Sequence, residues 1–235
     1  MHGVYMRAEE RNAGGLYKAD SNDKCQLYAV CDGMGGMDRG EAASLMAVSN
    51  IVGLSPLGTR RFTDGLRSYI DKTSDKLLYS GKGSGSAGCT LAAVYLDGSG
   101  AMTANLGDSR VYLKRKALPL ALVTEDHSQA VWYMKQGVLT AEEAETHPSR
   151  NTLRRYIGAP DAEGRTPDVA GPARIKRGDT FLICSDGLSN MLNATEIDAE
   201  ISTEKSCADI CRQIVTLALG RGGDDNITAM LIRVS

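Results

Sequence analysis

The feature that most constrains the fold is a run of short apolar segments that follow one another through turns, with no helix between them. Segments 90–96, 101–106, 111–114 and 120–123 are mostly apolar, and short polar or glycine-containing turns separate them. Parallel strands need a crossover of a dozen or more residues, whereas antiparallel strands need only a turn. The spacing therefore predicts antiparallel sheet.

Helical patterns occur between the blocks of strands. Residues 41–53, 62–78 and 205–219 carry apolar side chains at helical spacing. Further strands are expected at 27–31, 181–184 and 227–234. Because a helix does not follow every strand, the order of elements favours α+β layering over alternating parallel βαβ units.

Composition and charge narrow the class of protein. The 235 residues are 42% hydrophobic and 24% charged, which is typical of one large globular domain or two small ones. The formal net charge of −2 argues against a dedicated binder of nucleic acid or of anionic membranes. The six cysteines form no C-x-x-C pair, so neither a zinc site nor a disulfide framework is expected. No apolar run reaches the roughly 18–20 residues that cross a bilayer, and no signal-peptide core is visible, so the expected location is the cytoplasm.

The most informative polar residues are aspartates at or near the ends of apolar strands, in turns that contain glycine. Asp32 lies in DGMGG, Asp108 in GDSR, Asp186 in SDGL and Asp225 in GGDDN. Each of them alone reads as an ordinary turn residue. Four such carboxylates brought together would repel one another and need a cation. Oxygen ligands select magnesium, manganese or calcium over zinc.

Seven segments, taken in order, resemble the bacterial type 2C metal-dependent protein serine/threonine phosphatases, the PPM family. They are VCDGMGG, GEAAS, NLGDSR, EDHS, HPSRNTLRRYIG, GDTFLICSDGL and GGDDNIT, and the resemblance runs from about residue 4 to 234. It implies one phosphatase-like domain over residues 1–235, with an α+β fold. That fold is a four-layer αββα sandwich, in which two packed antiparallel sheets are flanked by helices. A flap beside the active site is implied at about 128–165.

The resemblance also implies roles for individual residues. Asp32 corresponds to the carboxylate that bridges two Mn²⁺ or Mg²⁺ ions, and the carbonyl of Gly33 to a ligand of the second ion. Asp186 and Asp225 correspond to ligands of the first ion. Asp108 corresponds to the residue that, with Asp186, holds a third and weaker ion.

The N-terminal segment matches the family only in part. Arg7 stands where the family places its phosphate-clamping arginine, a role that suits the paired donors of a guanidinium. Arg11 replaces an acidic position of the family pattern, and Asn12 replaces an aspartate that helps to hold the second ion. Asn190 likewise stands where relatives often carry aspartate. These three changes remove negative charge near the implied metals and predict a weaker metal affinity.

The implied function is hydrolysis of phosphoserine and phosphothreonine in proteins by a metal-activated water, opposing a bacterial Ser/Thr kinase. The alternative is a catalytically weak or inactive phosphatase-fold module that binds phosphoproteins, and Arg11, Asn12 and Asn190 motivate it. A hydrolase of small phosphate esters also stays open. The retained aspartates and Arg7 favour the enzyme.

Overall fold

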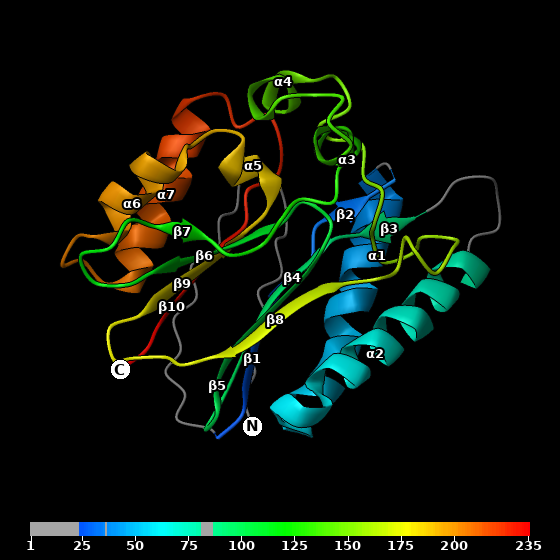
Figure 1. The fold of residues 1–235 in the computed structure, drawn as a ribbon, viewed down its shortest axis with the longest axis horizontal. Helices are drawn as coiled ribbons and strands as arrows, with labels where there is room; N and C mark the ends of the chain where they lie inside the picture. The colour runs from blue at the N-terminus through cyan, green and yellow to red at the C-terminus, as the bar shows by residue number, and fades with distance from the viewer. Residues whose placement is uncertain (1–23, 36, 81–86) are drawn as a thin grey trace.

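Two four-stranded sheets stack face to face in the centre of the molecule (Figure 1). The computed structural model describes residues 24–35, 37–80 and 87–235. The first sheet has the strand order β1-β4-β5-β8 and the second has β10-β9-β6-β7, with every pairing antiparallel. The first sheet consists of β1 (Gln26–Val30), β4 (Leu91–Asp97), β5 (Gly100–Leu106) and β8 (Asp168–Ala173). The second consists of β6 (Arg110–Lys114), β7 (Ala121–Leu122), β9 (Thr180–Cys184) and β10 (Ala229–Arg233). A small ladder pairs β2 (Gly33–Met34) with β3 (Gly88–Cys89).

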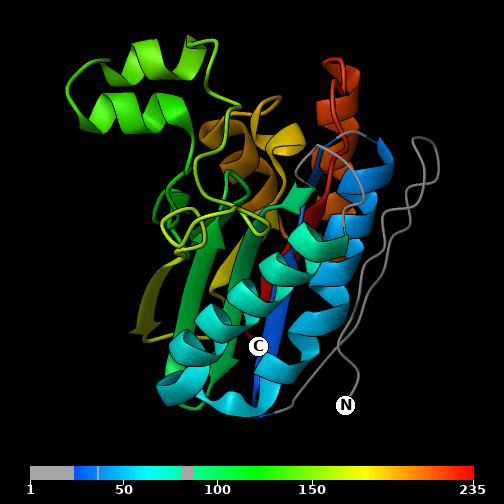
Figure 2. The ribbon, with the colours of Figure 1, turned by 90° about the vertical axis from the view of Figure 1, so that its right-hand side faces the viewer.

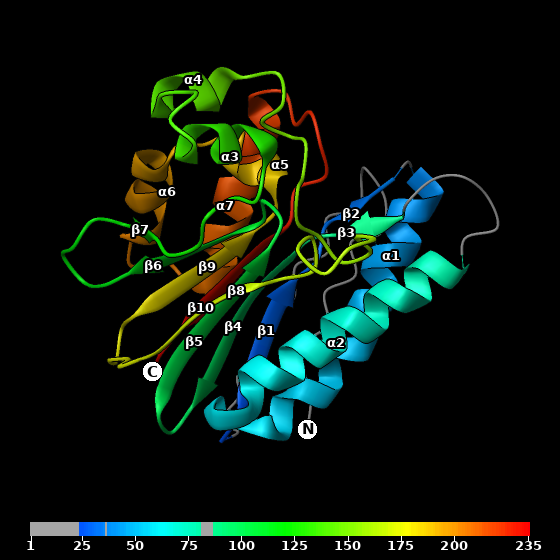
Figure 3. The same cartoon turned by 45° about the vertical axis from the view of Figure 1, so that its right-hand side comes forward.

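Helices cover the outer face of each sheet (Figure 3). The first sheet is covered by α1 (Met37–Asn50), the 3-10 helix η1 (Ile51–Leu57) and α2 (Thr59–Ser80). The second is covered by α5 (Asp186–Ser189), α6 (Ala194–Ile201) and α7 (Cys207–Gly220). A short hairpin of α3 (Gln129–Lys135) and α4 (Ala141–Thr146) projects from one end of the body (Figure 2). No helix in the described ranges is both long and apolar enough to span a membrane.

Strand β4 shows why the sequence folds into layers. Its side chains alternate between two cores, because successive residues of a strand point to opposite faces. Leu91, Ala93 and Tyr95 pack against the helices, whereas Ala92 and Val94 pack against the second sheet. A strand that is buried on both faces must be apolar throughout, and this is the pattern seen in 91–96.

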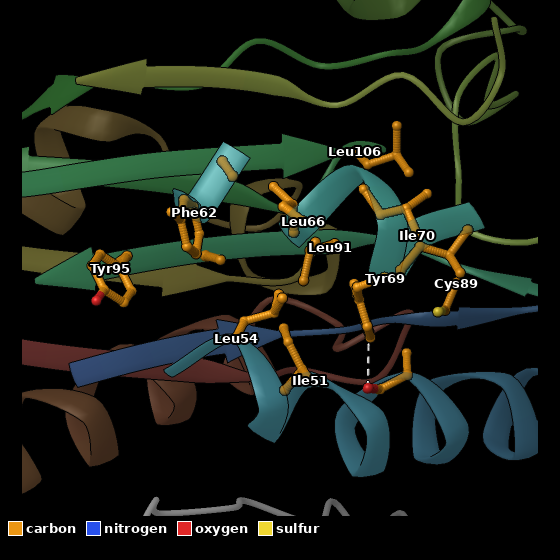
Figure 4. Packing of buried hydrophobic residues seen from close by; sticks show 14 of the residues in the cluster. Ile51, Leu54, Phe62, Leu66, Tyr69, Ile70, Cys89, Leu91, Tyr95 and Leu106 are labelled. Carbon is orange, nitrogen blue, oxygen red and sulfur yellow. Dashed lines mark hydrogen bonds between the residues drawn. The ribbon is translucent and has the colours of Figure 1, made fainter. Parts of the chain in front are cut away.

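One hydrophobic core lies between the first sheet and the helices that cover it, and it joins α2 to that sheet (Figure 4). Phe62 stacks on Tyr95 with ring centroids 4.7 Å apart, and Leu66 and Ile70 continue the same face of the helix. Tyr69 donates its hydroxyl to the carbonyl of Ala47 at 2.8 Å, which ties α2 to α1. Apolar burial thus attaches the helical layer, and one buried hydrogen bond sets the register between its two helices.

A corresponding core lies on the other side of the sandwich. In β9, Phe181 and Ile183 face the first sheet, whereas Leu182 and Cys184 face the helices. Ile210 of α7 packs into that outer core. The predicted α+β sandwich with four layers is therefore confirmed.

Candidate active site

The aspartates picked out in the sequence lie at one end of the sandwich. Asp32, Asp108 and Asp186 each lie two residues beyond a strand, namely β1, β5 and β9. Asp225 lies shortly before β10, which runs antiparallel to β9. Antiparallel pairing places the end of one strand beside the start of its neighbour, so the loops that carry these residues share one edge of the molecule.

The electrostatics show that these carboxyl groups are close neighbours. Burial, followed by the charges of Asp186, Asp225 and Asp108, raises the pKa of Asp32 to about 8. Burial and the charge of Asp186, followed by that of Asp126, raise the pKa of Asp108 to about 7. Burial and the charge of Asp225 raise the pKa of Asp186 above its usual range. Excess negative charge is therefore concentrated in a partly dehydrated place.

The donor set fits a hard divalent cation. The described ranges contain no ready-formed group of three or more His, Cys, Asp or Glu side chains arranged to hold a metal ion. Asp32 and Asp186 share a side-chain hydrogen bond, and the raised pKa of Asp32 indicates that positive charge would be stabilised there. Carboxylate and carbonyl oxygens are the ligands that Mg²⁺ and Mn²⁺ prefer.

The Asp32 loop is held by a close backbone contact. A Cβ atom on Gly33 would lie 2.0 Å from the carbonyl oxygen of Gly40, in the first turns of α1. Only glycine permits this approach, so the helix packs directly on the backbone that follows Asp32. Gly33 is also paired with Cys89 in the small ladder.

The loop that carries Asp225 is held against the start of α5. The Ser185 hydroxyl accepts a hydrogen bond from the amide of Thr228 at 3.0 Å and donates to the carbonyl of Asn226 at 3.2 Å. Gly187 leaves room for the same loop, because a Cβ there would lie 2.4 Å from the Asn226 oxygen. These contacts bring Asp225 beside Asp186.

Asn190, which the sequence analysis singled out, lies beside Asp186. Its Nδ2 donates to Oδ2 of Asp186 at 3.2 Å, from the residue that follows α5. An aspartate at this position would add a further negative charge to the cluster, whereas the amide donates a hydrogen bond to the carboxylate. Asn190 therefore orients Asp186 without adding charge.

Sequence reasoning missed the pair formed by Arg110 and Asp126. Nε of Arg110 donates to Oδ1 of Asp126 at 2.9 Å, and Nη2 donates to Oδ2 at 2.7 Å. The charge of Asp126 reaches both Asp108 and Asp186 and raises the pKa of each. Both residues lie in motifs recognised in the sequence, NLGDSR and EDHS, but only the pairing of β6 with β7 brings them together.

Three predicted site residues fall outside the part of the chain that the structure describes. They are Arg7, Arg11 and Asn12, which lie before residue 24. The phosphate clamp and the two departures from the family pattern remain predictions.

Comparison with known proteins gives consistent matches. A family model described as protein phosphatase 2C matches residues 16–217. The serine/threonine phosphatase stp of Listeria monocytogenes serotype 4b is 32% identical over 235 residues, covering 97% of this chain and 91% of that protein. The structure of the Streptococcus agalactiae serine/threonine phosphatase superposes with a TM-score of 0.81 and 31% identity, covering 94% of this chain and 97% of the other. The catalytic domain of the phosphatase PstP in complex with 2 manganese ions superposes with a TM-score of 0.72 and 25% identity, covering 92% and 94%.

Proposed function

We propose, from the premise that this chain belongs to the protein phosphatase 2C family and is a protein serine/threonine phosphatase, that its active site is the carboxylate cluster at the end of the sandwich. The observation that carries the proposal is that four aspartates from distant segments lie together at this end of the sandwich, where burial, followed by the charges of the other three, raises the pKa of Asp32 to about 8. A soluble domain stabilises such a concentration of buried charge only with a proton or a cation.

The residues that would hold the cations are Asp32, the carbonyl of Gly33, Asp108, Asp186 and Asp225. The family is metal-dependent, and its member PstP is described with manganese. We propose two Mn²⁺ or Mg²⁺ ions, with Asp108 and Asp186 able to hold a third. When bound, such ions supply an activated water and offset charge on the phosphoryl oxygens.

The chain's own groups prepare this chemistry. Asn190 donates to Asp186 and restricts the direction of that carboxylate. Arg110 donates to both carboxylate oxygens of Asp126, which fixes that carboxylate in place beside the cluster. Arg7 is proposed to clamp the phosphoryl group of the substrate through its guanidinium.

The raised pKa values of two cysteines support direct hydrolysis over a covalent phosphocysteine at either of them. Burial raises the pKa of Cys184 to about 12 and that of Cys211 to about 11. A thiol with such a pKa is protonated at neutral pH, and the thiolate is the nucleophilic form. Neither of these two side chains is suited to attack phosphorus.

The substrates we propose are phosphoserine and phosphothreonine proteins, phosphorylated by a bacterial Ser/Thr kinase in the cytoplasm. Residues 128–165 would be the flap that contacts them. The flap presents Trp132, whose ring packs under the guanidinium of Arg154 at 4.5 Å, and Val138, which is 65% exposed. Near the end of the flap, Ile157 pairs with Cys89 of β3, which connects the flap to the body of the protein.

The test is hydrolysis of a phosphothreonine peptide by the whole chain while Mn²⁺ is titrated. Asp225→Asn should lower the rate on the order of 100-fold or more, because a charged ligand is lost. Asp224→Asn is the matched control, since it makes the same change on an exposed neighbour in the same turn and should leave the rate unchanged. Equal rates for both variants and the wild type would refute the site assignment. A folded chain that binds the peptide without releasing phosphate would favour the regulatory alternative.

A further inference from the structure

Thr90 is a buried residue that contacts two segments of the candidate metal site, the Asp32 loop and the loop at 107–109. It lies between β3 and β4 and is 3% exposed. Its Oγ1 accepts a hydrogen bond from the backbone N–H of Asp32 at 2.9 Å. The same oxygen lies 2.7 Å from the hydroxyl of Ser109, which is 1% exposed. One hydroxyl therefore joins the residue proposed to bridge the cations to the residue that follows Asp108.

The bond to Asp32 replaces a backbone bond of the ladder. In a regular antiparallel pair, two opposed residues exchange both N–H···O=C bonds. Thr90 donates its own N–H to the carbonyl of Asp32 at 2.8 Å, but the N–H of Asp32 goes to the Thr90 hydroxyl. The long ladder between β1 and β4 ends at Val30 and Ala92, and the short ladder of β2 and β3 begins at Gly33 and Cys89 in the same register. The side chain of Thr90 thus replaces a backbone acceptor in the gap between the two ladders, where Asp32 lies.

The methyl group of Thr90 contacts the other side of the site. Gly107 has a φ of +113°, and a Cβ atom there would lie 2.7 Å from Cγ2 of Thr90. Gly107 and Ser109 flank Asp108, so the methyl and hydroxyl groups of Thr90 touch both neighbours of that aspartate. The side chain of Thr90 therefore contacts both the Asp32 loop and the Asp108 loop.

We propose that Thr90 is a positioning residue that fixes the separation of the Asp32 and Asp108 carboxylates, and that it does so chiefly through its hydroxyl. This inference rests on the proposed function, because that function gives the separation its importance. Thr90 makes none of these contacts through the carboxylates themselves. It acts on the backbone of Asp32 and on the residues that flank Asp108.

Two variants separate the groups of Thr90. Thr90→Val keeps the methyl packing and removes the hydroxyl, whereas Thr90→Ser keeps the hydroxyl and removes the methyl. Thr180→Val is the matched control, because Thr180 is equally buried at 3% and lies at the other end of β9 from Asp186. Mn²⁺ affinity, measured by calorimetry, should fall about 10–100-fold in Thr90→Val, as is typical when a group that orients metal ligands is lost. It should stay within about threefold of wild type in Thr90→Ser and Thr180→Val.

A second readout needs neither metal nor activity. Amide hydrogen exchange in metal-free protein should speed up at Asp32 and at 107–109 in Thr90→Val, and much less in Thr90→Ser or Thr180→Val. Equal Mn²⁺ affinity and equal exchange in Thr90→Val and Thr180→Val would overturn the inference. If Thr90→Val does not fold, Ser109→Ala replaces it, and unchanged exchange at 107–109 in that variant would equally overturn it. If wild-type protein neither binds Mn²⁺ nor releases phosphate, the proposed function fails, while the exchange data still decide the role of Thr90.

Discussion

At the scale of single residues, a hydrogen bond of His127 determines which of its ring nitrogens carries the proton. Its Nδ1 accepts the N–H of Gly107 at 3.1 Å, so that nitrogen carries no proton. Its Nε2 lies 3.3 Å from Oδ2 of Asp168, and Asp168 is also paired with Arg155. Burial lowers the pKa of His127 and outweighs the opposing effect of Asp168. The neutral ring thus supports the Gly107 backbone that precedes Asp108.

Protonation of His127 should therefore destabilise the protein in mild acid. Below the ordinary histidine pKa of about 6.5, the unfolded chain takes up a proton that the folded chain resists, so stability is lost as the pH falls from there toward the lowered folded pKa. The groups that face the ring are Asp168, Arg155 and Glu125. Denaturant unfolding should show that the free energy of unfolding of wild type falls relative to that of His127→Asn between pH 7 and 5; the raised pKa values of Asp32 and Asp108 act in the opposite direction, equally in both proteins.

The control for this prediction is His147→Asn. His147 lies in the proposed flap, where its Nδ1 is 2.7 Å from the hydroxyl of Ser149. This variant should follow the pH dependence of the wild-type protein. The same slope in all three proteins would show that His127 does not contribute.

At the scale of secondary-structure elements, α1 is placed by the contact of two glycines. A Cβ on Gly40 would lie 2.8 Å from the carbonyl carbon and oxygen of Gly33, and backbone atoms cannot move aside as a flexible side chain can. The first turn of α1 therefore fixes the position of the β2 backbone. The position of the Gly33 carbonyl, a proposed ligand, depends on this contact.

Gly40→Ala should destabilise the fold by about 1–3 kcal/mol, the usual effect of overpacking a filled contact. Gly53→Ala is the control, because no atom lies within 4 Å of a Cβ at that exposed position. That substitution should be neutral or stabilising by up to about 1 kcal/mol. Urea unfolding measures both free energies. Equal losses in the two variants would show that α1 shifts away from β2 without cost.

The elements that sequence patterns predicted are those with a regular apolar period. The expected strand 90–96 corresponds to β4, and the expected helix 205–219 corresponds to α7. Strand β8 was not predicted, because Gly171-Pro172 reads as a break and its mostly exposed residues show no alternation. Helix α6 did carry a readable signal, the capping box of Asn193 and Glu196.

The residues of the candidate site likewise fall into those that a local sequence pattern predicts and those that it does not. Strand ends are local features of the sequence, so Asp32 and Asp186 could be selected from their positions alone. The pairing of Arg110 with Asp126 depends on how β6 and β7 are registered, and the position of Thr90 depends on a break in a ladder. Neither leaves a local pattern, because both follow from contacts between distant segments.

At the scale of the whole molecule, the proposed site joins the two sheets. Asp32 and Asp108 come from the first sheet, and Asp186 and Asp225 come from the second. Burial, followed by their mutual repulsion, raises the pKa of Asp32, and that repulsion opposes the packing of the sheets at this end. A cation held between them would turn that repulsion into attraction, and the unfolded chain has no comparable site.

Mn²⁺ should therefore stabilise the entire fold. A ligand that binds only the folded state adds about 2.7 kcal/mol at 100 times its dissociation constant. For a chain of 235 residues that corresponds to a rise of about 5–10 °C in the melting temperature. Differential scanning calorimetry should show this rise in wild type and in Asp224→Asn, and a chelator should reverse it. Asp225→Asn should show a much smaller rise, because the second sheet then contributes one carboxylate less. A rise of equal size in all three proteins would place the stabilising cation elsewhere on the molecule.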